Sequence, residues 1–290
     1  MNADVPNTRG RERLFKMMCT IAKEMNDKTD CLTSKHSSVH VLDVCMAPGG
    51  FSRVALQANK GFATVDAFTL PEEDGGHRVM IPPDKNIQIC YADITMLAGE
   101  MGIDEIPTTH PEAPKFHLKW PFTRDLYDLV ICDGQTLRTH QVADYRKMSE
   151  QTRLFNVELI IALQRVKPGG TVIVLLHRLH KYRIFQLLNS FDKFSEINLF
   201  KPTTFHADRS SFYLVAKNVR PLCAEALRTI QSCKASWMRC TFPDSNEPPD
   251  DIGPGSDGTE DPEFLEKFLS IATPVWRVQE TALREARWMK

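Results

Sequence analysis

Residues 42–52 read Leu42-Asp43-Val44-Cys45-Met46-Ala47-Pro48-Gly49-Gly50-Phe51-Ser52 and join an apolar run to a helix-like stretch. The apolar run, 39–44, predicts a buried strand, and residues 51–59 predict a helix. A strand, a glycine turn and a helix form a nucleotide-binding corner, where the helix N-terminus offers free N–H groups. We expect the backbone at Gly49 and Gly50 to approach that ligand, because neither residue has a side chain. The G-x-G-x-x-G spacing of dinucleotide sites is absent.

The rest of the chain alternates between apolar runs and amphipathic stretches. The other predicted strands are 61–70, 87–91, 126–132, 171–176, 195–200 and 211–216, and the other predicted helices are 9–25, 95–101, 149–166, 182–189, 222–239 and 264–289. Residues 106–121 contain four prolines and predict an irregular surface insertion. We expect Pro168-Gly169-Gly170 to end the preceding helix. This alternation predicts an open α/β sheet with helices on both faces over residues 1–220, followed by a helical extension over 221–290.

The composition is that of a soluble globular protein, with 42% hydrophobic and 25% charged residues in 290. No apolar stretch approaches the ~18 residues of a membrane span, and the polar N-terminus has no signal-peptide core. We therefore expect an intracellular protein, cytoplasmic or nuclear, that does not contact membranes. The eight cysteines form no C-x-x-C pair and the nine histidines no ligand pattern with them, so no metal site is expected.

The net charge of −1 is unevenly distributed. Residues 241–263 hold eight acidic and no basic residues and predict a flexible loop; without them the formal charge would be +7. Residues 177–220 hold eight Lys or Arg and three Asp or Glu. This basic stretch is consistent with a surface that attracts RNA, and equally with ordinary solvated charges. If the acidic segment covers it, that segment could act as an internal decoy for nucleic acid.

Several ordered motifs resemble the FtsJ-type methyltransferases. The glycine turn at 47–52 matches the first motif of that family, and Asp133 ends an apolar strand as the catalytic aspartate of the family does. Residues 168–171 and 209–216 resemble its later blocks, so the resemblance runs through most of residues 9–217. More closely, the chain is similar to fungal FtsJ-domain proteins, with which it shares runs such as 93–97.

The resemblance implies a Rossmann-like class I methyltransferase sheet that binds S-adenosylmethionine at the carboxyl ends of its strands. By resemblance, the residues that surround the cofactor are Asp43, Cys45, Ala47, Pro48, Gly49, Gly50, Phe51, Asp66, Asp93, Ile94 and Asp133. Asp66 would accept hydrogen bonds from the ribose, although Thr69 or Leu70 could occupy that place. Asp93 would accept from the adenine amine, with Ile94 covering the ring. A strand-end aspartate can also be a turn or cap residue.

The family methylates a ribose 2′-hydroxyl with a Lys-Asp-Lys-Glu set, in which a lysine takes the proton of the weak nucleophile. By resemblance, Lys16 and Asp133 match the first two members, whereas Leu175 and Ser211 replace the second lysine and the glutamate. His177 lies two residues beyond Leu175, on the same face of the strand, and is a candidate base. His206 and Lys181 are further candidates.

Three hypotheses follow for function. The chain is a methyltransferase that acts on RNA ribose, a methyltransferase that acts on a small molecule whose hydroxyl or amine needs little base catalysis, or a non-catalytic module that binds cofactor or RNA. Tight RNA binding that weakens steeply with salt would favour an RNA partner.

Overall fold

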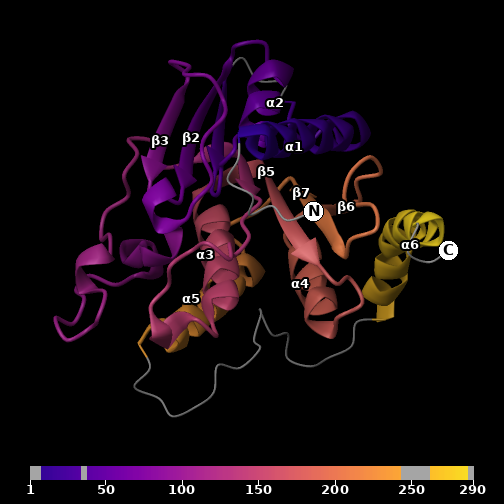
Figure 1. Ribbon diagram of the computed structural model, residues 1–290. Helices are drawn as coiled ribbons and strands as arrows, with labels where there is room; N and C mark the ends of the chain where they lie inside the picture. Colours follow the sequence, from indigo (N-terminus) through magenta and orange to yellow (C-terminus); the bar gives the residue numbers. More distant parts are fainter. Residues whose placement is uncertain (1–7, 34–37, 243–261, 287–290) are drawn as a thin grey trace.

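The computed structural model of this protein describes residues 8–33, 38–242 and 262–286 (Figure 1). A seven-stranded sheet runs through it in the order β3-β2-β1-β4-β5-β7-β6. The strands are β1 (Val39–Asp43), β2 (Ala63–Thr69), β3 (Ile87–Tyr91), β4 (Tyr127–Cys132), β5 (Val166–His177), β6 (Glu196–Phe200) and β7 (Ser211–Lys217). The first five are parallel, and β7 lies antiparallel between β5 and β6. The chain therefore has the predicted Rossmann-like class I methyltransferase fold.

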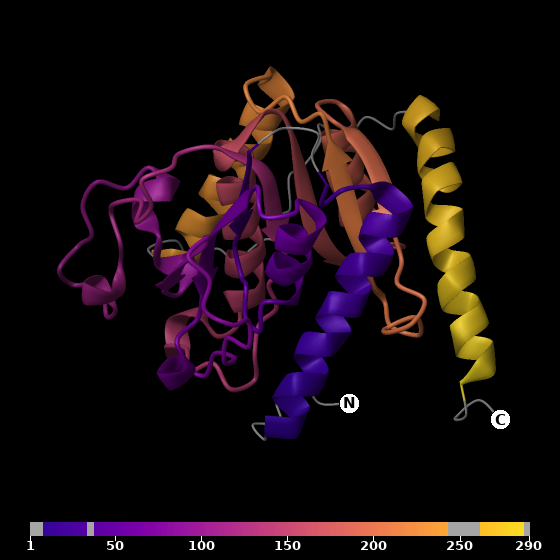
Figure 2. The same cartoon turned by 90° about the horizontal axis from the view of Figure 1, so that it is seen from above.

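Helices cover both faces of the sheet. They are α1 (Thr8–Thr29), α2 (Gly50–Ala58), α3 (Glu150–Arg165), α4 (Tyr182–Asp192), α5 (Ala224–Thr241) and α6 (Pro262–Glu285). Helices α1 and α2 cover one face, and α3, α4 and α5 cover the other (Figure 1). Figure 2 shows α6, in yellow, beside β6 at the edge of the sheet. Five short 3-10 turns lie in the connections: Glu72–Asp74, Ile94–Met96, Ala98–Met101, Ala113–Lys115 and Asp144–Arg146.

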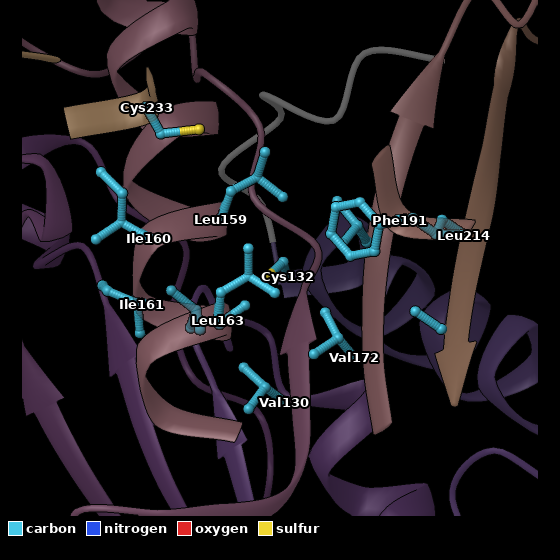
Figure 3. Close-up of a cluster of buried hydrophobic side chains, with 14 of the residues drawn as sticks. Val130, Cys132, Leu159, Ile160, Ile161, Leu163, Val172, Phe191, Leu214 and Cys233 are labelled. Carbon is cyan, nitrogen blue, oxygen red and sulfur yellow. The ribbon is translucent and has the colours of Figure 1, made fainter. Parts of the chain in front are cut away.

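Alternate residues of the central strands point into two separate hydrophobic cores. On β4, Val130 and Cys132 face α3, while Leu129 and Ile131 face α1 and α2. Figure 3 shows the first core, in which Val130 and Val172 lie against the apolar side of α3. Strands buried on both faces read as continuous apolar runs, which is why the sequence predicted them well.

Three local expectations were wrong. Strand β5 begins at Val166, not Thr171, because Val166 already pairs with Tyr127 and the strand then bulges. Pro168-Gly169-Gly170 therefore lies inside a strand and does not separate it from the helix. Residues 95–101 form two 3-10 turns in place of a helix.

Helix α5 packs against α3 on the far face of the sheet. Trp237 of α5 is fully buried, and its indole N–H donates to the Thr95 carbonyl at 3.0 Å. Asn156 of α3 donates to the Ser236 hydroxyl at 2.9 Å. A segment beyond residue 220 thus packs into the core of the sheet domain.

Most of the acidic segment 241–263 lies outside the described residues, so its expected flexibility and its role as a decoy stay predictions. In the described parts of the chain, no helix has both the length and the apolar character needed to cross a bilayer.

Candidate functional site

A cavity of about 470 Å³ opens at the carboxyl ends of the strands. It lies where the strand order reverses between β1 and β4, the place where open α/β sheets bind their ligands. Its wall comes from the segments that follow β1 to β4, from β5 and β7, and from one face of α1. The lining residues are Arg9, Gly10, Arg13, Leu14, Met17, Met18, Ile21, Val44, Cys45, Ala47, Pro48, Thr69, Leu70, His77, Ala92, Asp93, Ile94, Asp133, Gly134, Gln135, Thr136, Leu137, His140, Leu154, Leu175, His206 and Tyr213.

The predicted site residues divide into two groups. Those that line the cavity together are Cys45, Ala47, Pro48, Asp93, Ile94 and Asp133. Those that do not line it are Lys16, Asp43, Gly49, Gly50, Phe51, Asp66 and His177. The expected corner is therefore present, but several of its residues have roles other than ligand contact.

The two glycines do not border the cavity, contrary to expectation. Gly49 has a φ of 102°, a left-handed conformation that favours glycine, and begins α2. A Cβ on Gly50 would lie 2.5 Å from the Met18 Cβ and 2.8 Å from the backbone nitrogen of Cys19. Gly50 is thus required because α1 crosses the turn there. The ligand-facing part of the turn is the segment before the glycines.

Asp43 and Phe51 lie behind the turn. The buried Asp43 carboxylate accepts a hydrogen bond from the Ser52 hydroxyl at 2.5 Å and so joins the end of β1 to α2. The Phe51 ring packs against Tyr213, with ring centroids 5.6 Å apart. Both residues support the cavity wall from outside.

Asp66 is not placed to hold a ribose. It lies within β2, where it accepts hydrogen bonds from the Tyr127 hydroxyl at 2.9 Å and from Arg124 at 3.4 Å. Because β2 continues to Thr69, the residues at its carboxyl end are Thr69 and Leu70, which do line the cavity. Contact of Thr69 or Leu70 with the ribose stays a prediction.

Asp93 lines the cavity and also caps the start of the 3-10 turn Ile94–Met96. One carboxylate oxygen accepts from the Thr95 N–H at 2.9 Å, and the other from Arg146 at 2.8 Å. Burial works against ionisation here, but the Arg146 guanidinium lowers the pKa of Asp93 below its ordinary value. Few acceptor positions remain for an adenine amine, so adenine recognition by this carboxylate stays a prediction.

Arg146 is the centre of a buried charge network beside the cavity. It is 1% exposed and pairs with Asp93, with Glu150 at 3.1 Å and with Glu112 at 3.0 Å. Donor atoms of Asp93, His140 and Glu150 lie within 4.8 Å of one another, a spacing suited to a metal ion. The guanidinium already supplies the positive charge between the two carboxylates, so the cluster does not need a metal cation.

The catalytic candidates are dispersed. Lys16 is exposed and does not line the cavity, which α1 lines through Arg13, Leu14 and Met17. It follows the lining residue Arg9 by seven positions and therefore lies at the edge of the lining face of α1. Leu175 lines the cavity where the family has a lysine, whereas Ser211 is buried and does not line it.

His177 lies farther along β5 than Leu175 and outside the cavity wall. Burial, with the charges of Arg178 and Lys201, lowers its pKa below the ordinary value. His206, on the loop between β6 and β7, does reach the wall. The further candidate Lys181 is exposed at the start of α4 and does not line the cavity.

Three carboxyl groups lie close together beside the cavity, and no basic group in the described part of the chain pairs with them. Burial raises the pKa of Asp43 to about 7, of Asp133 to about 7 and of Glu158 to about 8. Glu158 accepts from the Gly134 N–H at 2.8 Å, and a Cβ on Gly134 would clash with that carboxylate and with the Cys45 sulfur. Of the three, Asp133 lines the cavity, whereas Asp43 and Glu158 lie behind its wall.

Sequence reasoning missed the α1 wall, Tyr213, Glu158 and His140. The α1 wall could have been found, because Gly10, Leu14, Met17 and Ile21 recur at helical spacing. The other three reach the site through long-range pairing of strands and packing of loops, which leave no local signal.

Comparison with known proteins identifies one family. The model for FtsJ-like methyltransferases matches residues 22–219, about two thirds of the chain. This range extends from the middle of α1 to just after β7 and contains every strand of the sheet. No curated protein matches the chain.

The solved structures whose chain path is similar share little sequence identity with this chain. A putative ribosomal RNA methyltransferase from Plasmodium falciparum has 17% identity and a TM-score of 0.46, over 72% of this chain and 98% of that one. The N-methyltransferase NodS from Bradyrhizobium japonicum has 13% identity and a TM-score of 0.42, over 69% and 97%. Human methyltransferase-like protein 13, in complex with SAH, has 13% identity and a TM-score of 0.38, over 82% and 93%.

Proposed function

Because the chain belongs to the FtsJ-like methyltransferase family, we propose that its cavity binds S-adenosylmethionine and that the protein transfers the methyl group to an acceptor other than RNA ribose. One observation carries the proposal: a cavity at the switch point of the sheet has Cys45, Ala47 and Pro48 on one side and Asp133 on the other. The donor supplies a methyl group on a positively charged sulfur. The carboxylate of Asp133 would stabilise that charge, and the apolar parts of the wall would exclude water.

Ribose methylation is disfavoured because, in the part of the chain that the structure describes, no lysine lines the cavity to take the proton of the hydroxyl. Lys16 is exposed outside the cavity wall, and position 175 is leucine. The buried Lys201 donates to three main-chain carbonyls, those of His206, Arg209 and Ser211, at 2.5–2.7 Å. A small molecule with a more acidic hydroxyl or an N–H needs less help from a base.

Calorimetric titration of the full chain with S-adenosylmethionine and S-adenosylhomocysteine tests the cofactor site. We expect micromolar binding that Ala47→Phe weakens by roughly tenfold or more, because the new ring fills the cavity. Lys16→Ala is the matched control and should bind as the wild type does, since Lys16 is exposed and does not line the cavity.

Equal binding by Ala47→Phe would place the cofactor elsewhere. Absence of binding by the folded wild type would contradict cofactor binding altogether. Binding without methyl transfer to any acceptor would favour the non-catalytic module.

RNA binding is expected to be weak, because the basic stretch 177–220 is partly used to hold the fold together. Lys201 is buried, Lys217 donates to carbonyls at the end of α1, and Arg220 donates to the Lys193 carbonyl. If about three phosphates are contacted, affinity for a single-stranded RNA falls less than about 20-fold between 50 and 200 mM salt. Fluorescence anisotropy measures this, and a much steeper loss would favour an RNA partner.

A further inference from the structure

Tyr213 of β7 lies beside Leu175, the position that the resemblance aligns with the second lysine of the family. Leu175 of β5 pairs with Tyr213 of β7, and both residues line the cavity. The Tyr213 hydroxyl donates to Asp133 Oδ1 at 3.0 Å. The neutral side chain of Tyr213 on β7 therefore contacts Asp133, and Tyr213 pairs with Leu175 across the two strands.

Tyr213 is held firmly in this position. Its ring packs against Phe51 of α2 at 5.6 Å and against Phe200 of β6 at 6.3 Å between centroids. The residue is 5% exposed, and burial together with Asp133 raises the pKa of its hydroxyl well above the ordinary value. The phenol is thus fixed as a hydrogen-bond donor and does not itself remove a proton at neutral pH.

No basic group among the described residues pairs with Asp133. The titratable groups that face it are Tyr213 on β7, Asp43 and Cys45 at the end of β1, Cys132 on β4, and Glu158 on α3. Arg9 and Arg13 of α1, with His140 and His206, also lie on the cavity wall. Its neighbours are thus neutral or acidic, which favours retention of a proton.

Asp133 still reaches the ligand space. Part of its surface remains open to the cavity, and Tyr213 contacts Oδ1, so Oδ2 is not held by this bond. A carboxylate with one oxygen held by a fixed donor and the other open to an acceptor has the geometry of a general base.

We propose that Asp133 is the general base of this methyltransferase, that Tyr213 positions it, and that the acceptor is a small molecule with an acidic hydroxyl such as a phenol. The inference rests on the proposed function. The acceptor oxygen forms a bond to the methyl carbon, the carbon–sulfur bond breaks with its electron pair left on sulfur, and the hydroxyl proton moves to Asp133 Oδ2. S-adenosylhomocysteine and the methyl ether are the products, and solvent later takes the proton. A phenolic hydroxyl is more acidic than that of ribose and needs less help from this base.

The number of protons that the protein takes up or releases when it binds S-adenosylmethionine tests the assignment of Asp133, and no methyl acceptor is needed. Calorimetry of the full chain in buffers of different ionisation enthalpy counts the protons exchanged. Asp133, with a pKa of about 7, is near half protonated at pH 7. The positive S-adenosylmethionine should therefore release about half a proton from it, and the neutral S-adenosylhomocysteine clearly less.

Two variants of nearly unchanged shape test the role of Asp133 as the base and that of Tyr213 as the residue that positions it. Asp133→Asn should lose most of this proton release and still bind S-adenosylhomocysteine. Tyr213→Phe should raise the midpoint of the release by about half to one pH unit, because the lost hydrogen bond favoured the carboxylate. Proton release unchanged from the wild type in both variants would overturn the assignment, whereas a wild type that binds neither compound would instead contradict the proposed function.

Acceptor class is tested with labelled methyl donor. Catechol, whose hydroxyl is more acidic than that of ribose yet protonated at neutral pH, is the small probe, and an RNA oligonucleotide is the comparison. We expect transfer to catechol that Asp133→Asn lowers at least 100-fold, a loss typical of removing a general base. In Tyr213→Phe, the pH profile should move upward by the same half to one unit. Transfer to RNA ribose, or to neither probe, would overturn the acceptor class.

Discussion

Arg146→Met lowers the free energy of unfolding by about 3–5 kcal/mol, the cost of breaking a buried ion pair by removing one partner. Arg146 is almost fully buried and contacts three carboxylates, those of Asp93, Glu112 and Glu150. Without the guanidinium, Glu150 keeps Arg153 at 3.1 Å and His140 at 3.7 Å, whereas the other two carboxylates lose their main buried partner. Methionine fills a similar volume, so the lost free energy of unfolding comes mainly from the missing charge and less from a cavity.

Urea unfolding followed by circular dichroism measures this change. Lys147→Met is the matched control, because the neighbouring Lys147 forms an exposed pair with Asp144 and should change stability by less than about 1 kcal/mol. A loss below about 1 kcal/mol in Arg146→Met would mean that the network contributes little to folding. The cofactor site should weaken in the same variant, since Asp93 and His140 line the cavity.

Three carboxyl groups beside the cavity lower the stability of the protein as pH rises from about 5 to 8, against a smaller opposite contribution from His40, His177 and His206, whose pKa values burial lowers. The pKa values of Asp43, Asp133 and Glu158 are higher in the folded chain than in the unfolded one. Over this window the folded state binds more protons than the unfolded state, so raising the pH favours unfolding. Each pH unit in the window costs about 1.4 kcal/mol for each group that retains its proton.

Glu158→Gln isolates the largest part of this effect. The amide oxygen still accepts the Gly134 N–H and cannot ionise, so the variant should match the wild type near pH 5. At pH 8.5 it should exceed the wild type by on the order of 3 kcal/mol. Thermal unfolding at both pH values measures the difference, with Glu266→Gln on the exposed side of α6 as control. Parallel pH curves for Glu158→Gln and wild type would show that Glu158 is ionised in the folded state.

The sheet was predictable and the site only in part, for physical reasons. Strands such as β1 and β4 are buried on both sides over most of their length, so their sequences are mainly apolar. The turn at 47–50 was predicted correctly, but its glycines serve a left-handed conformation and a helix crossing. Asp66 was assigned to the ribose by resemblance, but it lies in the middle of β2, three residues before its carboxyl end.

The catalytic centre depends on contacts between distant parts of the chain. Tyr213 meets Asp133 only because β7 inserts beside β5 in one register. Glu158 reaches the Gly134 N–H only because α3 packs under the end of β4. Neither contact has a local signature in the sequence. The resemblance could therefore indicate that a lysine and a glutamate of the family are absent at positions 175 and 211, but not that Tyr213 and Glu158 lie near Asp133 and Gly134.

The one buried lysine of the loop at 201–211 also limits how this chain could evolve. An ammonium group has three protons, and Lys201 gives all three to the carbonyls that shape the loop. Glu24 of α1 secures the same loop by accepting from the Thr203 N–H and hydroxyl. Recruiting this lysine for chemistry would release the loop, and a lysine introduced at position 175 would compete with Tyr213 for Asp133. A lysine base at this site would therefore require more than one substitution.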